Sequence, residues 1–222
     1  MSIQILYEDN HLVAVYKPLG LLVQGDKSGD ICLMDEVKEY LKNKYEKPGN
    51  VFLGLIHRLD RNVQGIVLFA KTSKGASRLS EQFREHAVEK IYHAVVVGRP
   101  SKNKDTLLHW LKKDENANRT TVYNQKTKDA QEAQLSYEVI KSNGNYSLLK
   151  IKLGTGRSHQ IRAQLAFTGC PIVGDIKYGA PDVLPDHAIM LAATSLSFDL
   201  ATGEERKNIT VSVPKDWAQA YA

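Results

Sequence analysis

A cluster of charged residues between two apolar segments constrains the fold of this chain most. Residues 55–61 read Leu-Ile-His-Arg-Leu-Asp-Arg, and an apolar run over residues 65–70 follows almost at once. Charged side chains are almost never fully buried unless they are paired. The cluster is therefore either a structural ion pair that closes a tight turn, or a functional carboxylate, Asp60, that its basic neighbours hold at the mouth of a cleft.

Length and composition indicate a globular chain. The 222 residues can form one substantial core or two small lobes that share a cleft. Apolar residues make up 42% and charged residues 25% of the chain, which is ordinary for a globular protein. The net charge of +5 permits a polyanionic partner such as a nucleic acid, although simple solubility explains it equally well.

The two cysteines and the apolar runs bear on the location of the protein. Cys32 and Cys170 have neither the spacing of metal ligands nor a disulfide framework, so a reducing cytosol fits best. Every apolar run is much shorter than the ~20 residues that a membrane-spanning helix needs, and no secretory signal is visible. We therefore expect a cytoplasmic protein without a membrane partner.

Short strands and tight turns dominate the pattern of the chain. Strands are predicted over residues 3–7, 12–16, 66–70, 90–97, 133–140, 146–153, 190–200 and 207–213. Helices are predicted from Asp30 to about Tyr45, from Ser73 to about Glu85 and from Ser158 to Phe167, each with its first residue as the N-cap. The predicted class is α+β, with a mixed, mainly antiparallel sheet and a few helices in a single domain over residues 1–222.

Residues 102–128 are the most polar part of the chain. They hold seven lysines or arginines against three acids, a local charge of +4, with Trp110 and Tyr123 between them. Basic residues interleaved with aromatic ones suit the rim of a nucleic-acid site. A solvated face of a hairpin is at least as compatible with this segment.

A glycine-rich turn precedes the third predicted helix. Residues 154–162 read Gly-Thr-Gly-Arg-Ser-His-Gln-Ile-Arg. Exposed backbone N–H groups at a helix start, with Arg157 beside them, predict an anion site. Arg162 follows Ser158 by four residues and so shares its helical face. The alternative is a structural turn, with Arg162 in an ordinary surface ion pair.

Tyr92 lies in a strand-like run, two residues after Lys90. Most tyrosines in strands are packing residues, and the local pattern alone does not give Tyr92 another role.

Several segments together resemble the RluA-type pseudouridine synthases. These segments are Lys17-Pro18-Leu19-Gly20, the His-Arg-Leu-Asp motif with the apolar run ending Phe-Ala-Lys-Thr, residues 90–96, residues 156–162, and residues 171–175 with Tyr178-Gly179. They occur in the order of the family and span residues 3 to about 215. The resemblance implies the pseudouridine synthase fold around a central RNA-binding cleft, in a catalytic domain without an N-terminal RNA-binding module.

The resemblance also implies roles for individual residues. Asp60 would be the essential carboxylate, Tyr92 the residue that faces the base, and Arg162 the partner of Asp60. The substrate- and RNA-binding residues would be Lys17, His57, Arg58, Arg157, His159 and Leu191, with Arg58 helping to hold open the site of the displaced nucleotide and Leu191 lining the uracil pocket. We expect His57 and His159 to make structural hydrogen bonds rather than to bind a metal.

Two positions depart from the pattern of the family. Val63-Gln64 stands where relatives usually have Thr-Ser, and Ala192 stands where a histidine is common. Neither position is one of the three main residues, so the departures concern the fine substrate preference.

The implied reaction converts uridine into its C-linked isomer. The N1–C1′ bond breaks, the uracil turns, and C5 joins C1′, without redox change or loss of a group, so we expect no cofactor and no metal. Asp60 either attacks C1′ or removes the C2′ proton, and Tyr92 either stacks or also takes the C5 proton; the sequence leaves both choices open. The expected partner is an rRNA or tRNA with a flipped uridine, bound by a monomer that does not act on DNA.

Two other functions compete with this one. A non-catalytic RNA chaperone would keep the fold but would not need Asp60, Tyr92 and Arg162 together. The other alternative is a glycosidase or phosphodiesterase that uses Asp60; a glycosidase would need a second carboxylic acid near Asp60, and no other acid occurs between Val51 and Glu81.

Overall fold

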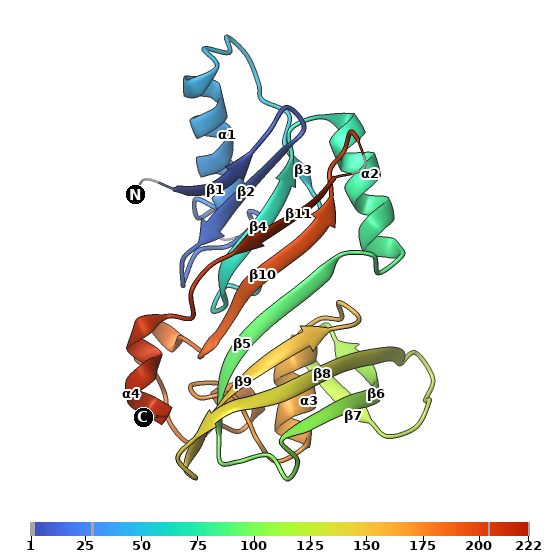
Figure 1. Cartoon of the computed structure of the whole chain (residues 1–222), viewed down its shortest axis with the longest axis vertical. Coiled ribbons are helices and arrows are strands. Elements are labelled where there is room, and N and C mark those ends of the chain that lie inside the picture. Colours follow the sequence, from blue (N-terminus) through green and yellow to red (C-terminus); the bar gives the residue numbers. More distant parts are fainter. Residues whose placement is uncertain (1–2, 28, 204, 222) are drawn as a thin grey trace. The chain divides into compact units, whose positions relative to one another are not determined.

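The computed structural model describes residues 3–27, 29–203 and 205–221. The chain divides into two compact units, which are coloured by sequence in Figure 1. The first unit is formed by Met1–Val88 and Ser195–Val211, and the second by Glu89–Thr194 and Ser212–Ala222.

The strands of the first unit pair in antiparallel fashion. They are β1 (Gln4–Glu8), β2 (Leu12–Lys17), β3 (Gly54–Leu55), β4 (Gln64–Ala70), the end of β10 (Leu191–Asp199) and β11 (Arg206–Thr210). β2 lies between β1 and β4, β3 pairs with β4, and β11 pairs with β10. All seven residues of β4 are buried, which explains why its sequence is a continuous apolar run rather than an alternating one.

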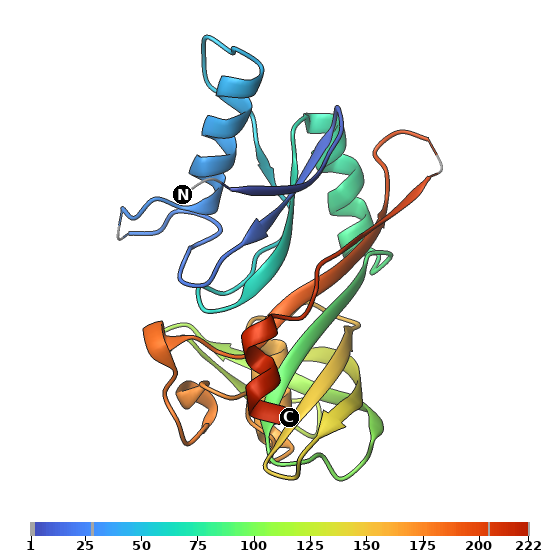
Figure 2. The ribbon, with the colours of Figure 1, turned by 60° about the vertical axis from the view of Figure 1, so that its left-hand side comes forward.

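Two helices pack on the strands of the first unit. α1 (Leu33–Lys44) buries Leu33, Val37 and Leu41, and α2 (Ser73–Arg84) contacts β3 and β4, as Figure 2 also shows. Leu79 of α2 joins a core cluster with alternate residues of β2 and β4 and with Phe198 of β10. The burial pattern therefore follows the period of 3.6 in the helices and of 2 in the strands.

The N-caps of these helices differ from the predicted ones. Cys32, not Asp30, caps α1, because the Asp35 carboxylate accepts a hydrogen bond from the Cys32 N–H at 3.2 Å. Thr72, not Ser73, caps α2, because its hydroxyl accepts the N–H of Gly75 at 3.1 Å. Both predicted helices exist, but the cap lies one or two residues away from the predicted position.

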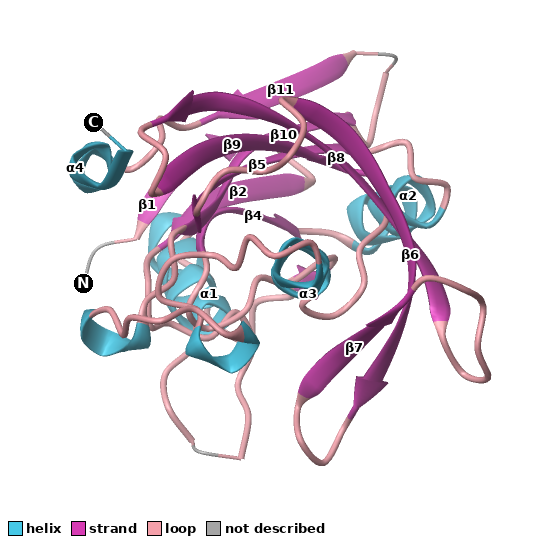
Figure 3. Ribbon diagram, turned by 90° about the horizontal axis from the view of Figure 1, so that it is seen from below, coloured by secondary structure: helices cyan, strands magenta, loops and turns pink. Residues whose placement is uncertain are grey.

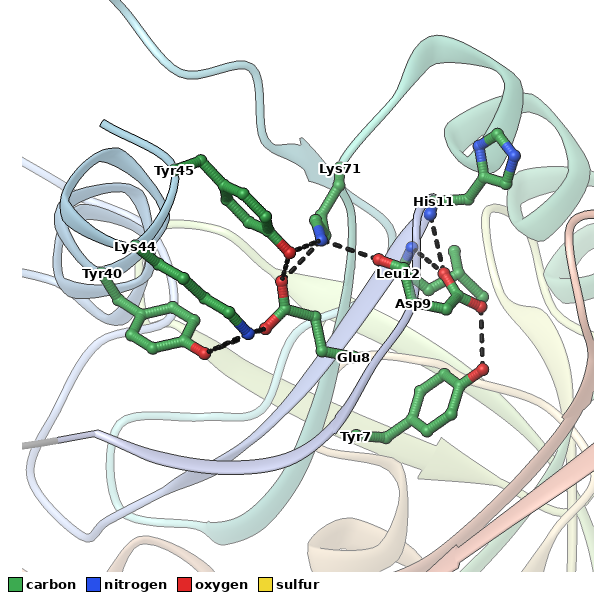
Figure 4. A network of polar contacts seen from close by, with 9 residues as sticks. All are labelled: Tyr7, Glu8, Asp9, His11, Leu12, Tyr40, Lys44, Tyr45 and Lys71. Atoms are coloured by element: carbon green, nitrogen blue, oxygen red, sulfur yellow. Dashed lines mark hydrogen bonds and ion pairs between the residues drawn. The ribbon is translucent and has the colours of Figure 1, made fainter. Parts of the chain in front are cut away.

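A network around Glu8 fastens α1 to β1 (Figure 4). The Glu8 carboxylate accepts hydrogen bonds from Tyr40, Lys44, Tyr45 and Lys71 at 2.6–2.9 Å. Burial opposes ionisation of this carboxyl, but these donors outweigh burial and lower the pKa of Glu8 to about 2. The network therefore acts as a charged structural anchor at neutral pH.

The second unit is built on five antiparallel strands. They are β5 (Glu89–Val97), β6 (Lys104–Asp114), β7 (Arg119–Tyr123), β8 (Gln131–Ser142) and β9 (Tyr146–Leu153). Their order is β5-β9-β8-β6-β7. The β8–β9 hairpin turns at residues 143–145, as the Asn-Gly signal predicts, and residues 102–128 form the β6–β7 hairpin with its flanking loops.

Helical segments complete the second unit. α3 (Gln160–Phe167) packs against β6, β7 and the short helix η1 (Ile176–Tyr178), and Figure 3 shows it inside the curve of the strands. α4 (Ala218–Tyr221) contacts β9 and η3 (Lys215–Trp217), and η2 spans Pro185–His187. Val95, Leu148, Val173, Ala192 and Trp217 form a core cluster of this unit.

The predicted α+β class, with mainly antiparallel strands and few helices, is confirmed. Every strand pairing given above is antiparallel. Within the described residues, no helix has both the length and the apolar character needed to cross a membrane.

Candidate active site

Asp60 lies in the loop between β3 and β4 of the first unit. Leu59 before it and Val63 after it are buried, and the Val63 N–H donates to the Asp60 carbonyl at 3.0 Å. The Asp60 side chain is half-buried, while Arg58 is exposed. The apolar neighbours thus fix the turn and leave the carboxyl at the surface of its unit.

Lys17, the last residue of β2, ties this loop to the Lys-Pro-Leu-Gly turn. Its side chain is fully buried, with 0% exposure, and its ammonium donates to the carbonyls of Pro18 and Arg61, both at 3.0 Å. Gly20 reinforces the tie: its N–H donates to the Arg61 carbonyl at 3.0 Å, and its φ of +79° favours glycine. The loop of Asp60 is therefore held through its backbone.

The pKa of Lys17 depends on its burial and on two charged neighbours. Burial lowers the pKa of Lys17 to about 7; the nearby Asp60 carboxylate opposes this shift, and Arg61 adds to it. Lys17 therefore changes its charge close to neutral pH.

His57 and Arg61 serve the local structure. The His57 Nε2 accepts the N–H of Leu68 at 3.0 Å, which places its ring proton on Nδ1, and the ring stacks on Phe83 at 5.0 Å. Arg61 donates to the Gly20 carbonyl at 2.9 Å and pairs with Asp30 at 3.2 Å, where both side chains are about half exposed. Arg61 thus joins the motif to the segment before α1 through a half-exposed pair with Asp30, and a structural ion pair that closes a turn within the motif stays a prediction.

Tyr92 and Lys90 share one face of β5 in the second unit. Their exposed fractions are 8% and 7%, while the intervening Ile91 is half-buried. Burial lowers the pKa of Lys90. Lys90 also lies beside the glycine-rich turn, since its Nζ is 3.9 Å from the position that a Cβ on Gly156 would take.

Arg162 makes a buried, bidentate ion pair with Asp175. Its Nε and Nη2 donate to the two carboxylate oxygens at 2.7 Å and 2.9 Å, and the side chains are 5% and 1% exposed. The possibility of an ordinary surface pair for Arg162 is therefore wrong. The sequence analysis gave Asp175 no role, although an acid that follows the apolar run 171–173 after a single glycine was a signal for it.

The start of α3 differs from the predicted helix start. Ser158 lies outside α3, and His159, in the left-handed conformation with φ of 50°, occupies the N-cap position without a side-chain cap. Ser158 therefore neither caps the helix nor shares a helical face with Arg162. The side-chain oxygen of Gln160 instead accepts the Arg157 N–H at 3.0 Å and the Thr155 hydroxyl at 2.7 Å. Because Gln160 already takes the Arg157 N–H, that group is not an exposed donor for an anion.

The residues at the positions that depart from the family pattern are buried. Ala192 is 1% exposed within the core cluster of the second unit, and Leu191 beside it is 3% exposed. Val63 is buried, and the Gln64 side chain accepts the hydroxyl of Tyr16 at 2.7 Å.

The basic segment is largely neutralised by ion pairs. Lys102, Lys104, Lys112 and Lys113 pair with Asp105, Glu138, Asp129 and Glu115, respectively, at 2.6–3.3 Å. Most of these side chains are exposed, so the pairs add little stability but reduce the local positive field. The geometry favours the solvated hairpin face, and a nucleic-acid rim stays a prediction.

Comparison with known proteins assigns the chain to a family. The family described as RNA pseudouridylate synthase matches residues 11–167, a range that includes Lys17, Asp60, Tyr92 and Arg162. The chain belongs to this family.

Among the described residues, no group of three or more His, Cys, Asp or Glu could hold a metal ion.

Curated relatives act on two classes of RNA by name. A ribosomal large subunit pseudouridine synthase C of Rickettsia prowazekii is 34% identical over 182 residues, which cover 82% of this chain and 58% of that protein. This chain therefore spans little more than half of that relative. A tRNA pseudouridine synthase C of Vibrio parahaemolyticus is 31% identical, with 100% of this chain and 94% of that protein covered.

A solved structure has the same fold. Human RNA pseudouridylate synthase domain containing 4 superposes with a TM-score of 0.81 at 25% identity, over 98% of this chain and 91% of that chain. This agreement confirms the pseudouridine synthase fold.

Proposed function

We propose that this chain is an RNA pseudouridine synthase that isomerises uridines in rRNA or tRNA, with Asp60 as the essential carboxylate. One observation supports the proposal above all: within the residues that match the family, Asp60 is half-buried in a loop whose backbone is bound to the buried Lys17. A carboxyl that is fixed through the backbone, with its side chain accessible, suits covalent or proton-transfer chemistry.

Asp60 can start the reaction by two routes. Asp60 either attacks C1′ and forms a glycosyl ester, or removes the C2′ proton and forms a glycal. In both routes the N1–C1′ bond breaks and the uracil turns. C5 then bonds to C1′, as the ester bond to Asp60 breaks in the first route or as C2′ regains its proton from Asp60 in the second, and the C5 proton passes to a base. Both routes use Asp60 as a carboxylate.

We assign Tyr92 and Arg162 to the same uridine. The ring of Tyr92 would stack on the base and hold it during its turn. Arg162, always protonated, would orient the Asp60 carboxylate, and its buried pair with Asp175 supports a fixed guanidinium plane.

RNA as the substrate class agrees with the relatives, which are named for rRNA and for tRNA. Chemistry at C1′ and C5 needs the nucleotide out of its stack, at a cost of a few kcal/mol in a duplex and less in an unstacked loop. Binding through phosphates should weaken as salt rises.

Replacement of the carboxylate tests the proposal. Asp60→Asn keeps the shape of the side chain, so the purified variant should bind RNA as the wild type does and form no pseudouridine. Asp182→Asn, which changes an exposed aspartate of the second unit, should form pseudouridine at the wild-type rate. The substrate is rRNA and tRNA from a strain that lacks the protein, and the readout is pseudouridine detected by chemical adduct and primer stop. Near-normal turnover by Asp60→Asn would refute the assignment.

A further inference from the structure

Tyr178 joins three separate segments of the second unit. It lies at the end of η1 and is 7% exposed. Its phenol oxygen accepts the N–H of Thr120 in β7 at 2.8 Å and lies 2.9 Å from Nδ1 of His159, which precedes α3. Its ring contacts the side chain of Arg162 in α3. A tyrosine that only filled a core would not need partners on so many elements.

Two guanidinium groups lie over the ring of Tyr178. The Cζ atoms of Arg162 and Arg119 are 5.2 Å and 5.5 Å from the ring centroid. Both distances are within the ~6 Å over which an aromatic ring attracts a cation. Asp175 holds the guanidinium of Arg162 through in-plane hydrogen bonds, whereas Tyr178 contacts it through the ring. The two contacts together restrict both the position and the tilt of the guanidinium plane.

The phenol oxygen of Tyr178 makes hydrogen bonds, whereas the ring contacts the guanidinium groups. Burial raises the pKa of Tyr178, so the phenol keeps its proton at neutral pH. The phenol oxygen accepts the Thr120 N–H and forms a second hydrogen bond with Nδ1 of His159. The Thr120 hydroxyl also donates to the Ser158 carbonyl at 2.9 Å. The oxygen therefore fastens the β6–β7 hairpin to the segment before α3.

We propose that Tyr178 is a positioning residue for Arg162, whose ring sets the tilt of the guanidinium and whose hydroxyl ties the β6–β7 hairpin to the start of α3. This inference rests on the proposed function for the role of Arg162 in turnover. The same tyrosine contacts both Arg119 of the hairpin and the arginine assigned to the reaction, and its ring, not its hydroxyl, makes the contact with Arg162.

Two substitutions separate the ring from the hydroxyl. Tyr178→Phe keeps the ring, so kcat should stay within about twofold of the wild type, while the Thr120 amide should exchange its hydrogen faster. Tyr178→Leu removes the ring, and kcat should fall about tenfold, the upper part of the range for one such contact, with KM changed by less than about threefold. Equal kcat values for the two variants, or an unchanged Thr120 exchange rate in Tyr178→Phe, would overturn the proposal.

A measurement without substrate distinguishes this inference from the proposed function. The Nε–H signal of Arg162 in nitrogen-edited NMR spectra is assigned by its loss in Arg162→Lys. It should shift and exchange faster in Tyr178→Leu and stay in place in Tyr178→Phe. Tyr146→Leu removes a half-buried ring packed on the core of the same unit and should leave the signal unchanged, which controls for general loosening. An unmoved signal in folded Tyr178→Leu contradicts the positioning role even if turnover is lost, whereas an RNA that is never isomerised contradicts only the proposed function.

Discussion

Asp60 and Arg162 lie in different units and are fixed in different ways. The loop of Asp60 is held by hydrogen bonds to backbone atoms, above all from the buried ammonium of Lys17, and the carboxyl itself stays half-buried. Arg162 is held through its own side chain, by the carboxylate of Asp175 and the ring of Tyr178, and is almost fully buried. The first arrangement leaves the carboxyl able to react, and the second keeps a permanent charge in one orientation.

The two supports also differ in how their charge depends on pH. The pKa of Lys17 is about 7, so the support of Asp60 changes its charge close to neutrality. A guanidinium does not lose its proton in this range, so Arg162 keeps its charge. Experiments that remove one support at a time test whether the two residues are held in these different ways.

The largest effect is expected from Asp175→Ala. It leaves the charge of Arg162 buried without its carboxylate partner, and loss of one partner of a buried pair costs about 3–5 kcal/mol. Urea unfolding of the variant and the wild type measures this change in the free energy of unfolding. Glu138→Ala removes one partner of an exposed pair with Lys104 and should cost no more than about 1 kcal/mol. A similar small loss for both variants would mean that Asp175 does not hold Arg162.

An intermediate effect is expected from Lys17→Met, which removes the hydrogen bonds from the ammonium to the carbonyls of Pro18 and Arg61, while the Gly20 N–H still donates to the Arg61 carbonyl. A hydrogen bond to a charged group contributes about 1.5–3 kcal/mol, so the free energy of unfolding should fall by about that amount. Turnover should also fall, because the loop of Asp60 loses its tie.

The pH dependence of this loss is specific to Lys17. The pKa is lowered from 10.5 in the unfolded chain to about 7 in the folded protein, so between these values the unfolded state binds more protons. Stability therefore rises with pH at this position, and the difference between wild type and Lys17→Met should grow from pH 7 to pH 10. Urea unfolding at several pH values measures it, and a difference that shrinks over this range would show that Lys17 is not held with a lowered pKa.

The smallest effect is expected from Tyr92→Phe. The variant keeps the ring and loses only the hydroxyl, so a stacking role predicts turnover within about threefold of the wild type. A role in removing the C5 proton predicts a loss of about 100-fold or more. Single-turnover rates on one RNA substrate distinguish the two roles, with Tyr92→Leu as the variant that lacks the ring.

Most strands were predictable because local rules govern them, whereas β3, β6 and β7 were not among the predicted strands. The run 65–70 and the Asn-Gly turn of the β8–β9 hairpin specify their structure within a few residues. The helix caps were less predictable, because neighbouring residues offer similar caps: Thr72 rather than Ser73 caps α2, and α3 begins after Ser158 without a side-chain cap. Composition and periodicity do not decide such competitions.

The supports of the site were the least predictable part. Lysine is rarely buried. The full burial of Lys17 depends on two carbonyl acceptors, and one of them belongs to Arg61, which is 44 residues away in the sequence. Asp175 lies 13 residues from Arg162, and Tyr178 lies 58 residues from Thr120. Such partnerships are set by tertiary packing, which a single sequence does not encode as a local pattern.

Complementation of a deletion strain tests the central role of Asp60 most directly. Pseudouridines in rRNA and tRNA are mapped by chemical adduct and primer stop in the strain without this protein, in the strain with the wild type restored, and in the strain with Asp60→Asn. The account predicts that at least one pseudouridine disappears on deletion, returns with the wild type and stays absent with Asp60→Asn. Its return with Asp60→Asn, or an unchanged set of pseudouridines on deletion, would contradict the account.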